Sequence, residues 1–583
     1  METSKTPKFD ALLDKIFETL VPHTRTCKWK GVHQYCEGDF NIEAEDIEFL
    51  KMLRVPPPNF CPTCRNIKRN SFYSWVRFFK RPCNAPDHSE LIISSVPINC
   101  PYKAVDMDYY VNIFDPLLYG IEPNTTSSIR DQFLQFRHIV PAPCLSNRDP
   151  SNINSDYSTG GRDLKNGYYV SGCFRSENVW YSSAINNSQD VMDSTFSHSC
   201  DRVYNVVRSE RVKTSSYTYF AEDCIDCMFL YDCRNCQDCT GAVNERNKRY
   251  IWFGEQLDRN EYMKRKNEFT KPLKRSQLEK FIEKFWDLVK SQPFRATRNT
   301  MSDDVDGVMI RESTDIKKST QVYRSKHARH CSNLLQHHDS MDVSISGGHS
   351  HHLYDTTNVG SQAAQVKFSA QTKFALESEF CLSCKHIEYC FMCIGVENKK
   401  YCIFNRPYEP SEYWTVVDEL KTKMLQDGEY ADGLTCEYSL QAYNVTVSSW
   451  SYPLPQDAIK KIGGYFQEEV ESNAGSLEVI SVDSLPDTIE EVTDDILTKA
   501  IACKKTGRPF RIVTTELEFY RRRGIPLPTI HPQIRIDGRI KFSDFLKSYL
   551  ATCHNCKKAI DSIVPESEGF NLYCDACYIK AVE

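Results

Sequence analysis

The residues best suited to chemistry in this 583-residue sequence are cysteines near the C-terminus. One Cys-x2-Cys pair consists of Cys553 and Cys556, and a second pair, Cys574 and Cys577, follows it closely. Four thiolates in two such pairs can surround one ion tetrahedrally, as in structural zinc sites of the zinc-ribbon and treble-clef type. Because the protein would supply all four ligands, no coordination position is left for a substrate. The spacing therefore predicts a structural zinc site.

A second candidate quartet lies near the N-terminus and consists of Cys27, Cys36, Cys61 and Cys64. Its first two cysteines are separated by eight residues, and His33 between them is a competing ligand. The same thiolates could hold an iron–sulfur cluster, although the sequence offers no further redox chemistry. We expect two structural Zn²⁺ sites, one near each end of the chain.

The two cysteine-rich regions contain copies of one segment, related by an offset of 470 in residue number that needs no gap between Phe40 and Cys83. The offset aligns Phe40 with Phe510, Glu48 with Glu518, Phe49 with Phe519, Pro56 with Pro526, Arg65 with Arg535 and Cys83 with Cys553. Matches of so many residue types in one register indicate an internal duplication. In the first copy, Pro86 stands where the second copy has Cys556, and in the second copy His531 stands where the first has Cys61. Each copy has thus lost a different site.

The stretch CEGDFNIEAEDIEFLKMLRVPPPNFCPTCR in the first copy resembles a zinc-ribbon domain. Together with ELEFYRRRGIPLP in the second copy and the cysteine-rich middle, it resembles a family of long uncharacterised zinc-binding proteins from environmental bacteria and large DNA viruses. The resemblance implies zinc-ribbon (treble-clef-like) domains at both ends and a repetitive middle. It implies no activity, because none is established for that family.

Short β-prone segments repeat at a regular interval in the middle of the chain, as the evenly spaced Val179, Val191 and Val203 illustrate. Such a period is typical of a parallel β-solenoid, in which each coil hydrogen-bonds to the next. We predict two solenoid segments, over 159–257 and 308–408. Both end on a shared signature at an offset of 151, NKRYIWFGEQLDRNEY and NKKYCIFNRPYEPSEY. Apolar residues at helical spacing predict helices between the two segments and after the second.

The predicted fold is a multidomain α+β protein with two parallel β-solenoid segments and interposed helices, flanked by duplicated zinc-ribbon/treble-clef-like modules. The expected order is an N-terminal helix (1–22), module copy 1 (23–115), a linker (116–158), the first solenoid segment (159–257), a helical insert (258–307), the second solenoid segment (308–408), a helix (409–430), a connecting segment (431–500) and module copy 2 (501–583).

Further cysteines and histidines lie within the predicted solenoid segments. Neighbouring strands are about 4.8 Å apart, which favours a ladder of buried thiols over a metal site for Cys224, Cys227, Cys233, Cys236 and Cys239. A further metal site and a thiol ladder both remain open for Cys381, Cys384, Cys390 and Cys393. Seven histidines between His327 and His352 could form a metal or acid–base cluster. Strand alternation instead favours a row of polar side chains that face solvent.

Single-stranded nucleic-acid binding is an alternative function for the segment from Cys61 to Cys83. Six cations occur there without one acidic residue, and aromatic residues are interleaved with them. The cations are Arg65, Lys68, Arg69, Arg77, Lys80 and Arg81. Cations that contact phosphates and rings that stack on bases are the usual means of such binding. The aligned segment of the second copy is less basic and contains Asp537 and Asp544.

A polysaccharide lyase or hydrolase built on the solenoid is a second alternative. It would use a pair of carboxylates as acid and base, either Asp190 with Asp193 or Asp339 with Asp342. Aspartates are also common at turns, however, and no phosphate loop, nucleophile elbow or metalloprotease helix occurs in the sequence. We assign no catalytic residue.

The totals fit a structural or interaction protein. A formal charge of −6 gives no overall attraction to nucleic acid, and 40% hydrophobic residues are typical of a folded chain. The N-terminus resembles no signal peptide, so we expect location in the cytoplasm or within an assembled particle such as a virion, without membrane contact. The 26 cysteines favour metal sites and buried thiols over disulfides. We expect a zinc-stabilised scaffold or assembly component whose partners are other protein subunits.

Overall fold

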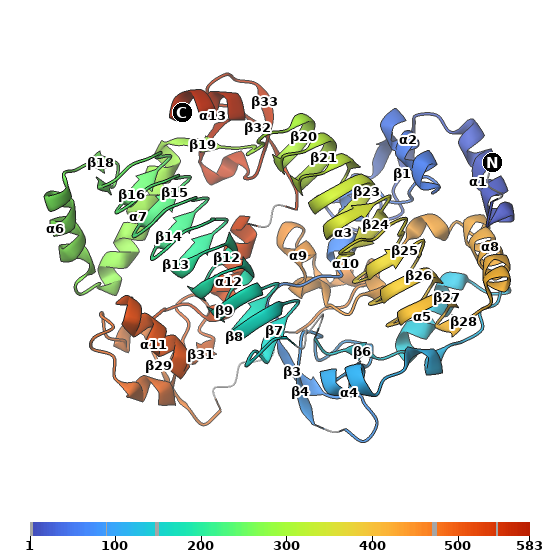
Figure 1. The fold of residues 1–583 in the computed structure, drawn as a ribbon, viewed down its shortest axis with the longest axis horizontal. Helices are drawn as coiled ribbons and strands as arrows, with labels where there is room; N and C mark the ends of the chain where they lie inside the picture. The colour runs from blue at the N-terminus through green and yellow to red at the C-terminus, as the bar shows by residue number, and fades with distance from the viewer. Residues whose placement is uncertain (1–3, 89, 146–150, 469–474, 544–545) are drawn as a thin grey trace.

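The computed structural model describes residues 4–88, 90–145, 151–468, 475–543 and 546–583. Figure 1 shows two stacks of short strands, one formed by β7–β18 and the other by β20–β28, with smaller units around them. The protein is a mixed α/β structure with many parallel strands, and its described residues include 13 α-helices. None of the helices in these residues is long and apolar enough to cross a membrane.

The first stack has a regular repeat along the chain, in which Asn166 donates to Asn178 Oδ1, 12 residues later. Val179 pairs in parallel with Val191, which pairs in turn with Val203. Its strands are β7 (Tyr157–Thr159), β8 (Arg162–Ser171), β9 (Phe174–Trp180), β10 (Ser183–Asn186), β11 (Gln189–Met192), β12 (Thr195–His198), β13 (Asp201–Val207), β14 (Ser216–Tyr219), β15 (Met228–Tyr231), β16 (Thr240–Val243), β17 (Ile251–Trp252) and β18 (Glu255–Gln256). Helices α6 (Arg259–Thr270) and α7 (Arg275–Ser291) follow, and α7 packs on β15 and β16.

Every third residue along much of the first stack adopts a left-handed backbone conformation. The φ angles lie between 49° and 55° in the run Asn178, Tyr181, Ala184, Asn187 and Asp190. Non-glycine residues rarely adopt this region, so the surrounding hydrogen bonds must enforce it. The N–H of Tyr181, for example, donates to the carbonyl of Tyr168 at 3.0 Å. One residue in three is consequently buried in a narrow core, as for Val179, Ser182, Ile185 and Ser188.

The second stack has a similar repeat with local departures. The N–H of Ser313 donates to Ser302 Oγ, 11 residues earlier, whereas the N–H of Ala363 donates to Ser350 Oγ, 13 residues earlier. Its strands are β20 (Asp303–Arg311), β21 (Thr314–Tyr323), β22 (Lys326–Arg329), β23 (Ser332–His351), β24 (Tyr354–Thr357), β25 (Lys373–Leu376), β26 (Lys385–Phe391), β27 (Glu397–Ile403) and β28 (Arg406–Pro407). Helix α8 (Pro410–Gln426) follows it.

The two cysteine-rich copies share one order of helices and strands, although equivalent elements differ in length. Copy 1 contains β1 (His23–Thr26), β2 (Asp39–Ile42), α2 (Ala44–Leu53), α3 (Pro62–Asn70), β3 (Phe79–Pro82), β4 (Leu91–Ser94), β5 (Ala104–Val105) and α4 (Met107–Asn112). Copy 2 contains β30 (Lys499–Ala502), β31 (Pro509–Phe510), α11 (Thr514–Arg523), α12 (Pro532–Ser543), β32 (Tyr549–Thr552), β33 (Ala559–Ser562), β34 (Asn571–Tyr573) and α13 (Asp575–Val582). The remaining elements are α1 (Pro7–Thr19), α5 (Ile129–Ile139), β6 (Ala142–Pro143), β19 (Pro293–Arg295), α9 (Val447–Ser451), α10 (Gln456–Lys461) and β29 (Glu478–Ile480).

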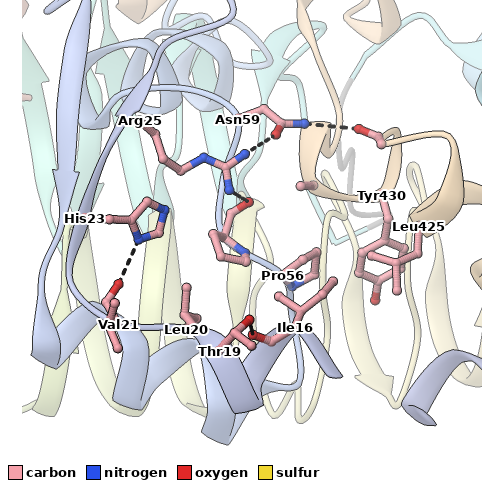
Figure 2. Close-up of a pocket in the computed structure, with 13 residues that line it drawn as sticks. Ile16, Thr19, Leu20, Val21, His23, Arg25, Pro56, Asn59, Leu425 and Tyr430 are labelled. Atoms are coloured by element: carbon pink, nitrogen blue, oxygen red, sulfur yellow. Dashed lines mark hydrogen bonds between the residues drawn. The ribbon is translucent and has the colours of Figure 1, made fainter. Parts of the chain in front are cut away.

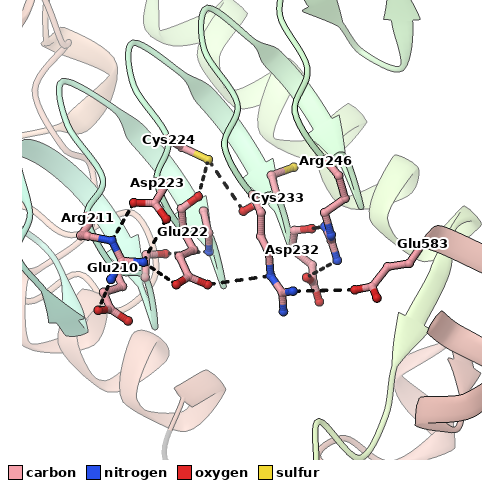
Figure 3. Close-up of polar contacts among 12 residues, drawn as sticks. Glu210, Arg211, Glu222, Asp223, Cys224, Asp232, Cys233, Arg246 and Glu583 are labelled. Carbon is pink, nitrogen blue, oxygen red and sulfur yellow. Dashed lines mark hydrogen bonds and ion pairs between the residues drawn. The ribbon is translucent and has the colours of Figure 1, made fainter. Parts of the chain in front are cut away.

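The first half of each copy docks on the stack that lies further away along the chain. Helix α3 of copy 1 lies against β23 and β24 of the second stack, and α12 of copy 2 lies against β12 of the first. The last helix, α13, approaches the far end of the first stack, where the Tyr578 hydroxyl donates to Asn244 Oδ1 at 2.8 Å. Figure 3 shows the nearby row of charged side chains, which includes Arg211, Glu222 and Glu583. Arg234 Nη1 lies 3.7 Å from Glu583 Oε1.

Candidate metal centres

The C-terminal quartet is assembled by a hairpin and the start of a helix. Cys553 follows β32, Cys556 lies in the turn before β33, Cys574 is the N-cap of α13 and Cys577 lies in its first turn. The four sulfurs all lie within 4.8 Å of one another, and Cys556 Sγ is 3.8 Å from Cys574 Sγ. Tetrahedral zinc with bonds of about 2.3 Å would separate its sulfurs by about 3.8 Å. The group could therefore hold one metal ion.

Backbone amides point at the sulfurs of this quartet. The N–H of Cys574 donates to Cys553 Sγ at 3.3 Å, and the N–H of Cys577 donates to Cys574 Sγ at 3.5 Å. Burial alone would raise the pKa of the Cys553 thiol, but backbone N–H donors, including those of Cys556 and Cys574, lower it to about 6. The thiolate, which is the form that binds metal, is thus favoured at Cys553, whereas burial and the neighbouring thiols raise the pKa of Cys574 to about 12.

The N-terminal quartet has the same construction. Cys27 follows β1, Cys61 is the N-cap of α3 and donates its N–H to Cys27 Sγ at 3.3 Å, and Cys64 lies in the first turn of that helix. These sulfurs and that of Cys36 all lie within 4.8 Å of one another. His33 does not belong to this group, although its Nε2 lies 3.4 Å from Cys64 Sγ. Hydrogen bonds from Cys61 and Cys64 lower the pKa of Cys27 to about 4.

The corresponding site of the second copy keeps the geometry but only one of its four cysteines, Cys503. His531 precedes α12 as Cys61 precedes α3, and its N–H donates to Cys503 Sγ at 3.3 Å. Burial, aided by nearby arginines, lowers the pKa of His531 to about 4, so its ring is neutral at pH 7. Phe510, Phe519 and Ile525 are buried here, as the equivalent Phe40, Phe49 and Val55 are in copy 1.

The cysteines of the stacks lie in their narrow cores. Cys224, Cys227, Cys233, Cys236 and Cys239 are all buried, as are Cys381, Cys384, Cys390 and Cys393. None of them belongs to a described group of three or more ligands within 4.8 Å of one another. Their sulfurs approach backbone carbonyls instead, as Cys381 Sγ does with the carbonyl of Cys390 at 3.6 Å. This arrangement is that of a thiol ladder, and additional metal at the stacks stays a prediction.

The basic segment that suggested nucleic-acid binding is largely occupied by protein contacts. Arg65, Lys68 and Arg69 of α3 are buried, and Arg65 and Arg69 bind the two oxygens of Asp342 at 2.8 and 2.9 Å. Lys68 pairs with Asp355, which is also buried. Cations held in this way do not contact a phosphate. Of the other three, Arg81 is buried and donates to the carbonyl of Pro97, Arg77 pairs with Asp537, and Lys80 is exposed.

Three of the four carboxylates considered for catalysis are similarly engaged, as are His327 and His338. Asp193 is buried and binds Arg535 and Arg539 of α12, the latter at 2.9 Å, just as Asp342 binds its two arginines. Asp339 pairs with His327 at 2.7 Å and with His338 at 2.9 Å. The remaining candidate differs, since Asp190 is only partly buried and accepts from Asn178.

Sequence reasoning missed the role of Asp342 and Asp193 as docking sites for two helices. Asp342 lies 273 residues after Arg69, and Arg535 lies 342 residues after Asp193, so no local pattern marks the contacts. The alignment of the two copies carried one signal. Arg65 and Arg535 are equivalent in the two copies, and so are Arg69 and Arg539. On both helices the two cations lie at i and i+4, and no acid lies three or four residues from either of them; Asp537 of α12 pairs with Arg77 instead. Such a repeated pair indicates a distant acidic partner.

Two cavities lie away from the quartets. One of about 430 Å³ lies among α1, β1 and α8, and Figure 2 shows its mostly apolar wall. Its cation, Arg25, donates to Asn59 Oδ1 at 3.0 Å, and His23 Nδ1 lies 2.8 Å from the carbonyl of Val21. The other, of about 740 Å³, is lined by both stacks and contains several arginines. Arg298 there binds Asp232 and lies over the ring of Phe220.

Comparison with protein-family models and with curated proteins gave no match to this chain. The resemblance to the zinc-binding family therefore stays a prediction. The two groups of four cysteines rest on the geometry of the chain itself.

Proposed function

We propose that this protein is a structural scaffold whose two ends fold around zinc, and that it performs no catalysis. In this proposal the two stacks are parallel β-solenoids, and the quartets are zinc-ribbon or treble-clef-like sites. The scaffold would be an assembly component that binds other protein subunits, for example in a virus-like particle.

The observation that carries the proposal is the continuity between the N-terminal quartet and the contact with the second stack. Cys61 and Cys64 begin α3, and Arg65 and Arg69 follow them on the same helix. Both arginines bind Asp342 inside the interface. Metal in the quartet would fix the start of the helix whose next residues join the module to the stack, so metal binding would contribute directly to folding.

Zinc suits both quartets better than other metals do. Four thiolates in a tetrahedral arrangement select zinc or iron–sulfur clusters, and zinc requires no redox partner. Each quartet has four protein ligands, which is the composition of structural and not of catalytic zinc sites. The free energy of binding at such sites is about 10–16 kcal/mol, enough to decide whether a small module folds.

The test combines metal analysis with amide hydrogen exchange. We expect at least two zinc ions per purified chain. Cys36→Ser should remove one of them and accelerate exchange in α3 and in β24, on which α3 packs. Cys100→Ser is the matched control, because Cys100 is a buried cysteine outside the described groups of ligands, and it should change neither readout.

Two results would contradict the proposal. One is folded protein that contains no metal and exchanges its amides as slowly as the metal-bound form does. The other is iron in place of zinc, which would reassign the quartets to redox chemistry.

A further inference from the structure

A third group of potential metal ligands lies in copy 1, where the ungapped alignment predicted a lost site. Ligand atoms of Cys83, His88 and Asp106 all lie within 4.8 Å of one another. Asp106 Oδ2 is 3.5 Å from Cys83 Sγ and 3.7 Å from His88 Nδ1. Sulfur, imidazole nitrogen and carboxylate oxygen are all ligands that zinc accepts.

The backbone around these residues repeats the backbone of the C-terminal quartet. Cys83 follows the first strand of the β3–β4 hairpin, as Cys553 follows the first strand of β32–β33. The N-cap of the next helix donates its N–H to that sulfur in both modules, from Asp106 at 3.4 Å and from Cys574 at 3.3 Å. This donation fixes the distance between the first cysteine and the helix.

A second hydrogen bond is also common to the two modules. The residue after the first cysteine donates its N–H to a carbonyl of the strand before the helix. Asn84 does so to Ala104 at 3.0 Å, and His554 does so to Leu572 at 2.8 Å. Two independent contacts therefore match the ligand cradle of copy 1 to that of the intact quartet.

The ligands differ because the hairpin turn of copy 1 is two residues longer. The turn spans 83–90 between β3 and β4, and 553–558 between β32 and β33. His88, and not Pro86, therefore takes the place of Cys556, while Asp106 takes the place of Cys574. An alignment without gaps hides both replacements.

The fourth cysteine has no replacement in copy 1. Tyr109 follows the N-cap by three residues, as Cys577 does in copy 2, and its N–H donates to Asp106 Oδ1 at 2.8 Å. The other carboxylate oxygen, Oδ2, is the one that faces Cys83 and His88. The His88 side chain is 45% exposed, so solvent reaches this cluster.

We propose that Cys83, His88 and Asp106 bind one divalent metal ion of the zinc class, with a fourth position that takes water or a small anion. Three protein ligands and one exchangeable position distinguish this site from the two closed quartets. The site adds an exchangeable metal centre to the scaffold and does not depend on the function proposed above.

Metal stoichiometry of the full chain tests the proposal. We expect wild-type protein saturated with zinc to hold three ions, and Cys83→Ser or His88→Ala to hold two. Asp108→Asn is the matched control, since it removes an exposed carboxylate two residues from Asp106 and should leave three. Saturation of the wild type at two ions would overturn the proposal, as would retention of three in both variants. Retention of two ions also indicates that the quartets remain folded in the variants.

A spectroscopic experiment tests the exchangeable position. Apo-protein given two equivalents of zinc fills the quartets first, and one equivalent of Co²⁺ then reports on the third site. Azide should shift the visible absorption of this cobalt, whereas cobalt placed in the quartets of Cys83→Ser should not respond. An unchanged spectrum in the wild type would refute the open position. Absence of zinc from the quartets would contradict the scaffold proposal separately.

Discussion

Replacing Asp342 by asparagine should destabilise the protein more than almost any other single charge change. Asp342 is fully buried, and so are the side chains of Arg65 and Arg69 that bind its two oxygens. Burial alone would raise the pKa of Asp342, but the two guanidinium groups outweigh it and hold the pKa below its usual value. The carboxylate is therefore charged at neutral pH, and Asp342→Asn leaves two buried cations without their counter-charge.

The expected cost follows from the burial of all three groups. Removing one partner of a buried ion pair costs about 3–5 kcal/mol, because the remaining charge stays desolvated. An unfolding entropy of about 2.1 cal/mol/K per residue gives ~1.2 kcal/mol/K for a chain of this length that unfolds as one unit. The corresponding fall in melting temperature is about 2–4 °C, and it would be larger if copy 1 and the second stack unfold separately.

The assay is urea unfolding of the variant beside a triple variant that also lacks the two arginines. Arg65→Met with Arg69→Met in the Asp342→Asn background removes the unpaired cations, so this triple variant should be more stable than the single variant. Glu312→Gln is the control, because Glu312 forms an exposed pair with Arg324 and should shift stability by less than about 0.5 kcal/mol. A loss below about 1 kcal/mol for Asp342→Asn, or a triple variant no more stable than the single one, would refute the reasoning.

Two further predictions concern the second stack. Gly307→Ala should lower the free energy of unfolding in urea by more than about 1 kcal/mol, since φ is 130° and an added Cβ would meet the Ser319 carbonyl at 1.9 Å. Gly538→Ala is the control, because this glycine of α12 faces open space, and it should be neutral or stabilising. Equal effects of the two substitutions would contradict the steric argument. Burial lowers the pKa of His337 to about 3, so the folded state binds its proton less readily than the unfolded state, and stability present above pH ~6.5 is lost as the pH falls. Between pH 7 and pH 5 the free energy of unfolding should therefore fall by about 2 kcal/mol less in His337→Ser than in the wild type. Parallel plots of this free energy against pH for the two proteins would exclude the role of His337.

The metal quartets could be predicted from sequence because their ligands are local. Cys574 and Cys577 are three residues apart at the start of one helix, and Cys61 and Cys64 have the same spacing at the start of α3. The even spacing of Val179, Val191 and Val203 likewise gave the parallel register of the first stack. His88 was missed because a two-residue insertion follows Cys83, just beyond the stretch from Phe40 to Cys83 that aligns without a gap.

The burial of α3 could not be predicted, because its basic surface is the usual sign of a solvated or phosphate-binding face. Only the partner Asp342, on a distant strand, turns Arg65 and Arg69 into interface residues. The left-handed corners were hidden for a similar reason. Tyr181 is not a turn-forming residue type, and its conformation is enforced by pairing with the neighbouring repeat instead of by its own preference.

The two docking contacts have the same construction, with two arginines of a module helix on one aspartate of a stack. Arg535 and Arg539 are offset by 470 from Arg65 and Arg69, and Asp342 is offset by 149 from Asp193. The signatures at the ends of the stacks are offset by 151, which is two more than the offset of the two aspartates. Two repeats of the second stack account for this difference, because Met341 pairs with Tyr354 and Tyr354 with Lys367, each 13 residues apart instead of 12. Modules and stacks are thus repeated at different offsets, yet each copy of the module helix meets the equivalent aspartate of a stack.

Each module docks on the stack more distant along the chain. Arg69 and Asp342 are 273 residues apart, and Asp193 and Arg535 are 342 residues apart, so both contacts close very long loops. The entropy of such closure must be offset at the interface, and the buried charge pairs together with metal-fixed helix starts can offset it. The N-terminal module cannot complete its interface until the second stack has been synthesised. Metal bound early to Cys27, Cys36, Cys61 and Cys64 would keep the start of α3 folded during that interval.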